Sequence, residues 1–262
     1  MALMALGAVE DQRATMAIAS RVASCNNCPL RGSARFREHT ESEATFIEAY
    51  KVGELGIDEG AVLFEEGADS AHIYTVLSGW AFRYKLTDDG SRQILSFALP
   101  GDLLGLQASL FGSLDHSVQA LSGVRLCVFE RTKFYDIFRK QSGLAYDVTW
   151  LAARQERLLD ETLVNIARRS AVKRIAYLLL FLLDRAHQSG EAEGNEMILP
   201  LTQDHVADAL GLSLVHTNKS LRKLVNDEFV EWQSGRIKLF RLKELQEFAG
   251  YEPSDEVKRP FI

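Results

Sequence analysis

The sequence predicts an α+β protein in which an antiparallel β-domain comes first, a long helix follows, and a small helical domain comes last. Glycines recur at regular intervals among short β-like runs in the first half of the chain. Apolar residues then recur at helical spacing, and two short helical stretches meet at a glycine further on. An apolar fraction of 47% and a charged fraction of 25% are ordinary values for a globular protein with a substantial core.

The β-domain is predicted between about residues 57 and 129. Glycines stand at positions 60, 67, 79, 90, 101 and 112, and the last four intervals are 12, 11, 11 and 11 residues. Between the glycines lie runs rich in β-branched and aromatic residues, such as HIYTVLSG and QILSFALPG. Short strands separated by turns at this spacing are typical of a small antiparallel barrel or sandwich.

The residues from about 142 to 166 are predicted to form one long helix. Leu144, Val148, Leu151 and Leu158 belong to a heptad-like stripe that is interrupted at Gln155. Such a stripe can pack on the chain's own β-domain or pair with its twin in a homodimer. The length of the helix and the charges on its other faces favour the homodimer, with these leucine and valine side chains at the dimerisation contact.

The residues LTQDHVADALGLSLVHTNKSLRKL predict a helix-turn-helix. Thr202 can cap a first helix, Gly211 can take the positive φ that ends it, and Ser213 can cap a second helix over residues 214–225. The inner face of this second helix is predicted to consist of Leu214, Leu221, Leu224 and Val225.

The outer face of the second helix is predicted to read double-stranded DNA. Its candidate DNA-binding residues are Ser213, Val215, His216, Asn218, Lys219 and Arg222. Asparagine can pair with adenine, lysine and arginine with guanine or phosphate, and valine can touch a thymine methyl group. Residues 214–243 contain seven Lys or Arg against three Asp or Glu, in a chain of net charge −6. Two β-like runs around Ser234 and Gly235 indicate a β-wing beside the helices.

Several other classes of protein are disfavoured by the sequence. Three cysteines cannot all pair within one chain, and the apolar start meets Glu10 and Asp11 too soon for a signal peptide. The most apolar run, Ile175–Leu183, is far shorter than the roughly 20 residues of a membrane span. No common motif of a catalytic site is present. We therefore expect a cytoplasmic protein that is not an enzyme and makes no membrane contact.

The parts together resemble the Crp/Fnr family of bacterial transcription regulators. The resemblance rests on YTVLSGWAFRY, QILSFALPGDLLG, LCVF and the helix-turn-helix residues, and it covers about Cys25 to Leu245. It implies a β-roll sensor like a cyclic-nucleotide-binding domain, a long dimerisation helix and a winged helix-turn-helix. It also implies a homodimer that binds a palindromic operator and acts with RNA polymerase.

The resemblance suggests a division of the chain into five parts. These are an N-terminal extension (1–24), the β-roll with its cysteine loop (25–141), the dimerisation helix (142–168), the DNA-binding domain (169–250) and a tail (251–262). Pro253 and the charges after it predict that the tail is loose.

Cyclic AMP is not expected as a ligand. Family members that bind cyclic nucleotides carry a Glu shortly after the P-G-D turn and an Arg-Ser pair before the next strand. Here Leu106 stands near the Glu position, and His116 and Ser117 stand at the Arg-Ser position. A neutral histidine cannot replace the bidentate fork that an arginine offers to a phosphate.

The cysteines resemble part of an iron–sulfur ligand set. The Fnr branch of the family holds its Fe-S cluster by three cysteines in a C-x2-C-x5-C arrangement and a fourth on a late strand. Cys25 and Cys28 match the first two and Cys127 matches the strand cysteine, whereas Ala34 occupies the third position. An Fe-S cluster would therefore need a ligand of another type.

Two residues near the gap can supply that ligand, because a histidine or a carboxylate can take one position of a cluster. They are Glu38 and His39. Arg31, Arg35 and Arg37 are expected to favour the thiolate form by lowering the pKa of the cysteines.

Three interpretations of the cysteines stay open at this point. They can hold an Fe-S cluster that responds to oxygen or nitric oxide. Cys25 and Cys28 can instead form a reversible disulfide or part of a zinc site, or all three thiols can be without a function. Two hypotheses for the protein correspond to these interpretations. The first is a transcription regulator that senses a redox or gaseous signal, and the second is a metal-free regulator whose β-roll binds a small molecule other than cyclic AMP.

Overall fold

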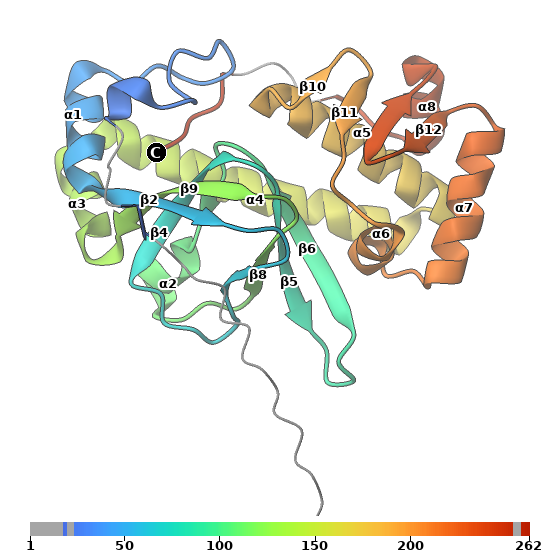
Figure 1. The fold of residues 1–262 in the computed structure, drawn as a ribbon, viewed down its shortest axis with the longest axis horizontal. Helices are drawn as coiled ribbons and strands as arrows, with labels where there is room; N and C mark the ends of the chain where they lie inside the picture. Colours follow the sequence, from blue (N-terminus) through green and yellow to red (C-terminus); the bar gives the residue numbers. More distant parts are fainter. Residues whose placement is uncertain (1–17, 20–23, 254–257) are drawn as a thin grey trace, which may run out of the picture.

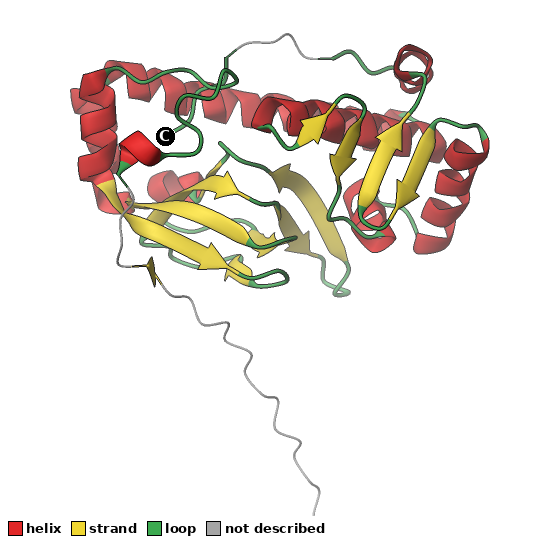
Figure 2. Ribbon diagram, turned by 45° about the horizontal axis from the view of Figure 1, so that its top comes forward, coloured by secondary structure: helices red, strands yellow, loops and turns green. Residues whose placement is uncertain are grey.

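Figure 1 shows the fold in a computed structural model, which describes residues 18–19, 24–253 and 258–262. A β-domain with two sheets occupies one end of the molecule, and a helical domain with a third small sheet occupies the other (Figures 1 and 2). This is the predicted α+β architecture. Nearly all of the predicted N-terminal extension lies outside the described residues.

The β-domain consists of two antiparallel sheets. The first has the strand order β1 (Ile18–Ala19), β2 (Lys51–Ile57), β9 (Val124–Glu130), β4 (His72–Ser78) and β7 (Leu103–Leu104). The second has the order β3 (Val62–Phe64), β8 (Ser117–Ala120), β5 (Ala81–Leu86) and β6 (Arg92–Ala98). Strands β5 and β6 form a hairpin, called the sensor hairpin below, which turns at Gly90 with a φ of +81°.

Apolar side chains between the two sheets form the core of the β-domain. Val76, Leu114, Val118 and Leu126 are fully buried there. Three short helices surround the sheets, namely α1 (Glu41–Tyr50), α2 (Leu106–Phe111) and α3 (Phe134–Lys140). Helix α1 begins with a capping box between Thr40 and Glu43, so two of its free amide groups find partners within the first turn.

Helix α4 (Ser142–Arg168) follows and is 27 residues long. At 1.5 Å per residue its length is about 40 Å, which is enough to pass the β-domain and reach the helical domain. It contacts α3, β6 and α5. The side chains of Leu144 and Val148 are buried in an apolar cluster of the β-domain, and Leu151 is buried one turn further along the helix.

The helical domain contains four helices and a four-stranded antiparallel sheet of order β10-β11-β13-β12. Its elements are α5 (Ala171–Ser189), β10 (Ala192–Glu193), β11 (Glu196–Ile198), α6 (Gln203–Leu210), α7 (Leu214–Asn226), β12 (Val230–Gln233), β13 (Arg236–Leu239) and α8 (Leu242–Ala249). Helix α5 includes the most apolar run of the sequence. Neither α5 nor any other helix in the described part of the chain combines the length and apolarity needed to cross a membrane.

The two domains share one hydrophobic core. Ile175, Leu179 and Leu182 of α5 are fully buried in a cluster that includes Phe82 and Ile94 of the sensor hairpin. The same cluster reaches α6, α7 and the small sheet. The helical domain is therefore packed on the sensor hairpin as well as on α4.

Residues 258–262 fold back onto the β-domain, and we call them the return segment. Arg259 is 2% exposed, and Phe261 and Ile262 are each 4% exposed. A parallel bridge joins Arg259 to Phe36, in the loop before α1. The prediction of a loose tail is thus wrong for these five residues, because a buried arginine and two apolar side chains fix them in place.

Candidate functional site

The helix-turn-helix has the caps that the sequence predicts. The Thr202 hydroxyl accepts a hydrogen bond of 3.3 Å from the backbone N–H of His205 at the start of α6. Gly211 ends α6 with a φ of +61°. The Ser213 hydroxyl accepts a hydrogen bond of 3.3 Å from the N–H of His216 at the start of α7. These two caps and the glycine fix the angle between the two helices.

Helix α7 presents five of the six predicted DNA-binding residues to solvent. Ser213, Val215, His216, Lys219 and Arg222 are all exposed, and Val215 is exposed to 79%. Asn218 is half-buried. Among the described residues Lys219 and Arg222 have no ion-pair partner, so both charges are available to an anionic partner.

The inner face of α7 differs from the prediction at both ends. Leu221 and Leu224 are buried as predicted, but Leu214 and Val225 are exposed. Thr217 and Ser220 are buried in their place. Helix geometry explains the difference, because residues 217, 220, 221 and 224 share one side of a helix with 3.6 residues per turn.

Strands β12 and β13 form the predicted wing beside α7. They pair in antiparallel register, and the turn between them places Ser234 and Gly235 at positive φ values of 50° and 73°. Such a turn joins two strands by a two-residue loop. Lys238 lies on β13 opposite Glu231 of β12, so the wing carries charges of both signs.

The three cysteines lie around one small cavity, which we call the thiol pocket. Cys25 begins the short helical turn Cys25–Asn27, Cys28 follows this turn directly, and Cys127 belongs to strand β9. The other lining residues are Arg31, His39, Ala44, Ile47, Lys51, Glu54, Leu77, Phe129, Phe261 and Ile262. The fold therefore brings together the three thiols that the sequence groups as one site.

Only one of the two predicted additional ligands lies in the thiol pocket. His39 lines the pocket, and its Nε2 is 3.0 Å from the backbone oxygen of Phe261. Burial lowers the pKa of His39. Glu38 and Ala34 are exposed and do not line the cavity.

The predicted lowering of the thiol pKa by the loop arginines is wrong for Cys25 and Cys127. Burial raises the pKa of Cys25, and it raises the pKa of Cys127 to about 12, although the charge of Lys51 acts in the opposite direction. Arg37 is directed elsewhere, because its guanidinium group is paired with Asp147. The Cys25 and Cys127 thiols are therefore protonated at neutral pH.

The thiol pocket in this arrangement does not fit an Fe-S cluster. Its volume is about 30 Å³, which is room for one or two water molecules, whereas a cluster with several iron and sulfide ions is much larger. Within the described ranges, no group of three or more His, Cys, Asp or Glu side chains is placed to hold a metal ion. The zinc site considered from the sequence is not formed either.

A second cavity, of about 260 Å³, lies between the β-domain and helix α4. Leu106 and His116, the two positions singled out in the sequence when cyclic AMP was considered, both line it. Arg83 of β5 lines it too, and its Nη2 is 3.4 Å from Nδ1 of His116. Within the described part of the chain, Nε of Arg83 and Nε2 of His116 are buried without a hydrogen-bond partner.

The electrostatics of this second cavity favour an anion. Burial lowers the pKa of His116 to about 3, and the nearby charge of Arg83 acts in the same direction. Burial also lowers the pKa of Arg83, to about 10, which keeps the guanidinium charged at neutral pH. Arg83 was not among the residues predicted from the sequence, although a charged residue within the apolar run WAFRY is a signal that could have revealed it.

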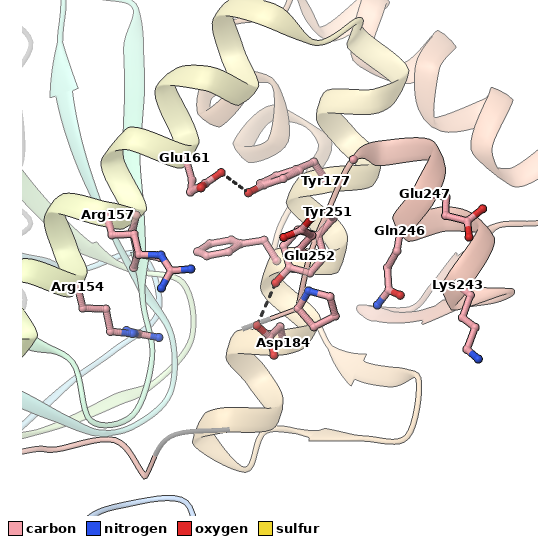
Figure 3. A pocket seen from close by; sticks show the side chains of 14 residues that line it. Arg154, Arg157, Glu161, Tyr177, Asp184, Lys243, Gln246, Glu247, Tyr251 and Glu252 are labelled. Atoms are coloured by element: carbon pink, nitrogen blue, oxygen red, sulfur yellow. Dashed lines mark hydrogen bonds between the residues drawn. The ribbon is translucent and has the colours of Figure 1, made fainter. Parts of the chain in front are cut away.

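A wide hollow of about 610 Å³ lies between α4, α5 and α8. Figure 3 shows Arg157 extending from α4 toward it and the two tyrosines Tyr177 and Tyr251 at its centre. Tyr177 donates a hydrogen bond of 2.8 Å to Glu161, and Tyr251 donates one of 3.0 Å to Asp184. Because its tyrosine hydroxyls are already paired, we assign no ligand to this hollow.

Comparison with known proteins identifies both domains. Residues 55–141 match the model of the cyclic nucleotide-binding domain, and residues 173–248 match that of the Crp-like helix-turn-helix domain. The chain is 30% identical over 200 residues to the nitrogen fixation regulation protein FixK of Bradyrhizobium diazoefficiens, covering 76% of this chain and 83% of that protein. It is 25% identical over 226 residues to the fumarate and nitrate reduction regulatory protein of Vibrio cholerae, covering 86% and 90%.

The solved structures show the same fold. The structure of FixK2 from Bradyrhizobium japonicum matches with a TM-score of 0.67 and 23% identity, covering 77% of this chain and 98% of that one. An antiparallel β-domain, a long helix and a winged helix-turn-helix with an exposed basic face define a DNA-binding transcription regulator. Taken with the relative that is 30% identical, the two matched domains show that the chain belongs to the Crp/Fnr family.

Proposed function

We propose that the protein is a homodimeric transcription regulator that reads a palindromic operator through α7 and senses a redox or gaseous signal at the thiol pocket. The observation that carries the sensing part is the convergence of Cys25, Cys28 and Cys127 on one cavity. The domain division at residues 25–141, 142–168 and 169–250 is part of the same proposal.

Operator recognition is assigned to the exposed face of α7. Lys219 and Arg222 can bind phosphates or guanine. Asn218 can bind adenine once its side chain turns outward, because its Oδ1 is buried in the described structure. Val215 is the most exposed apolar residue of the helix and suits contact with a thymine methyl group. Two copies of this face, related by a two-fold axis, would read two half-sites one helical turn apart. Contact with RNA polymerase is part of the expected role of the complex.

The homodimer contact is assigned to the second half of α4. Leu144, Val148 and Leu151 of the predicted stripe are already buried, so they have little surface left for a partner. Leu158 is half-buried. Leu159, Leu163 and Val164 are exposed apolar side chains on the same helix. A partner helix that covers them would remove apolar surface from water on both copies.

The sensing step is assigned to the thiols. Oxidation of Cys25 and Cys28 by hydrogen peroxide would form one S–S bond, with both thiol protons and two electrons passing to the peroxide, which leaves as two water molecules. Such a bond would alter the loop that forms one wall of the thiol pocket. Relatives named for nitrogen fixation, for fumarate and nitrate reduction and for anaerobic regulation support a signal linked to oxygen.

The test is operator binding by the anaerobically purified, reduced protein before and after hydrogen peroxide. We expect the affinity to change in the wild type and to stay constant in Cys25→Ser and Cys28→Ser. Iron and acid-labile sulfide should be measured on the same sample, because their presence would mean that the pocket opens to hold a cluster. If the protein contains no iron and its affinity for the operator is the same with and without oxidant or oxygen, the thiol proposal is contradicted.

The second cavity supports one alternative function, which is regulation by a small anionic effector other than cyclic AMP. The supporting observation is the pair of buried, unpartnered nitrogen atoms on Arg83 and His116. Thermal denaturation against a panel of carboxylates and phosphates is the test. A ligand that stabilises the wild type but not Arg83→Gln would favour the effector, and equal stabilisation of both would exclude this cavity.

A further inference from the structure

We propose that the return segment, residues 258–262, is a latch that closes the thiol pocket and ties the DNA-binding domain to the β-domain. The segment follows the DNA-binding domain in the chain but packs on the opposite domain. Cys127 is 6% exposed, and its thiol would become accessible only when the latch opens, whereas Cys25 and Cys28 are half-buried with the latch in place. Its meaning for gene regulation rests on the proposed function, whereas the latch itself can be tested without DNA.

The backbone of the latch is held by the loop before α1. The N–H of Arg37 donates to the oxygen of Arg259 over 2.9 Å, and the N–H of Arg259 donates to the oxygen of Arg35 over 3.0 Å. These two bonds form the short parallel bridge at Phe36. The loop that carries Arg35 and Arg37 also carries Cys25 and Cys28 at its start, so latch and thiol loop are neighbours.

The side chain of Arg259 anchors the latch in the β-domain. Its guanidinium group is paired with Asp102 of the P-G-D turn and donates a hydrogen bond of 3.2 Å to the oxygen of Pro100. Asp102 is also paired with Arg185 of α5 and lies 3.6 Å from Arg154 of α4. One carboxylate, 16% exposed, therefore joins the β-domain, the long helix, the DNA-binding domain and the latch.

Phe261 and Ile262 cover the thiol pocket. Both residues line it, and both belong to the apolar cluster that contains Cys127. The ring of Phe261 lies edge-on to Phe36 at 5.4 Å and against His39 at 4.4 Å. The buried surroundings that raise the pKa of Cys127 thus include the latch, which keeps this thiol protonated and shielded from reagents in water.

The length of the chain couples the latch to the position of the DNA-binding domain. Tyr251 donates a hydrogen bond to Asp184 of α5 and so fixes the chain to that domain. Five peptide steps join Pro253 to Lys258, and a fully extended chain spans at most about 18 Å over that number. A movement of the DNA-binding domain that takes Pro253 further than this distance from Lys258 must pull the latch away from Cys127.

The experiment compares the alkylation rate of Cys127 by iodoacetamide in four full-length proteins, followed by mass spectrometry of the peptide that contains this residue. They are the wild type, Phe261→Ala/Ile262→Ala, Arg259→Ala and the control Lys258→Ala. Lys258 is an exposed residue of the same segment. We expect the alkylation rate to rise by about tenfold or more in Phe261→Ala/Ile262→Ala and in Arg259→Ala, because local opening of a cover governs access to a buried group. We expect no change in Lys258→Ala.

Circular dichroism of each variant checks that the fold is retained. Equal alkylation rates in the wild type and in a folded Phe261→Ala/Ile262→Ala would overturn the latch, and so would an equal increase in Lys258→Ala. Operator binding is measured separately on the same samples. Faster alkylation of the variants, together with operator binding that does not change with oxidant, would support the latch and reject the redox function. Operator binding that changes with oxidant, together with equal alkylation rates, would support the redox function and reject the latch.

Discussion

Arg92 of the sensor hairpin and Asp208 of helix α6 form an ion pair of 2.7 Å across the domain interface. Beside it, the side-chain amide of Gln93 donates to the backbone oxygen of Ala209 over 3.4 Å. The guanidinium group of Arg92 also lies over the ring of Phe82. The tip of the β-domain is thus in direct polar contact with the first helix of the helix-turn-helix, which gives a displacement of the hairpin a short route to the DNA-binding residues.

The first prediction concerns the coupling free energy between Arg92 and Asp208. The side chains of Arg92 and Asp208 are 27% and 26% exposed, so solvent screens the pair and a double-mutant cycle with Arg92→Gln and Asp208→Asn should give a coupling of about 0.5–1 kcal/mol. The cycle is measured by urea denaturation at low and high salt, and the coupling should shrink as salt rises. A coupling of zero at low salt would mean that the two side chains do not stabilise the interface.

The second prediction concerns DNA binding. Lys219→Ala and Arg222→Ala should each weaken operator binding, by about 1–3 kcal/mol if a base is contacted. A contact to phosphate should instead lower the slope of log K against log salt by about one. Fluorescence anisotropy with an operator fragment at several salt concentrations distinguishes these cases.

The matched control for DNA binding is Lys133→Ala. Lys133 is a half-exposed lysine that lies far along the chain from the helix-turn-helix and is paired with Glu130 in the β-domain. It should leave both affinity and salt slope unchanged. The assigned reading face is incorrect if Lys219→Ala and Arg222→Ala behave like this control.

The third prediction concerns the homodimer. Leu163 is 66% exposed on α4, and Leu163→Asp should shift the protein from dimer to monomer because it places a charge in an apolar contact. Sedimentation velocity measures the change. Tyr135→Asp is the control, since Tyr135 is equally exposed but lies on α3. A dimer that tolerates Leu163→Asp would move the contact to another surface.

The fourth prediction concerns pH. Burial lowers the pKa of His116 from 6.5 to about 3, so below pH 6.5 the unfolded chain takes up a proton at this residue and the folded chain does not. Stability should therefore fall as the pH decreases from 6.5 toward 3, by up to about 1.4 kcal/mol per pH unit from this residue alone. His116→Gln should make that slope shallower in urea denaturation between pH 6.5 and 4.5. His216→Gln, at an exposed position on α7, should retain the wild-type slope.

The order of domains and the helix-turn-helix could be predicted from the sequence because their signals are local. A cap at Thr202, a glycine at position 211 and a second cap at Ser213 act within a few residues of one another. The grouping of the three cysteines was available only through the resemblance to a family, since Cys127 follows Cys28 by about a hundred positions and only the folded chain places both beside one cavity.

The environment of the thiols could not be predicted in the same way. Three arginines near Cys25 suggested a lowered pKa, but burial has the larger effect, and burial depends on Phe261 and Ile262, which lie more than 200 positions away. The place of Arg83 in the second cavity could not be predicted either, because its neighbour His116 lies 33 positions further along the chain. Long-range packing decides both features.

The shared core of the two domains limits how this regulator can be recombined. Phe82, Ile94 and Phe97 of the sensor hairpin are packed in the same apolar cluster as α5, α6 and α7. A chimaera that joined residues 169–250 to an unrelated input domain would leave that face of α5 in water, where exposed apolar surface promotes aggregation. Exchange of input domains in evolution or in engineering therefore has to transplant this aromatic hairpin together with the DNA-binding half.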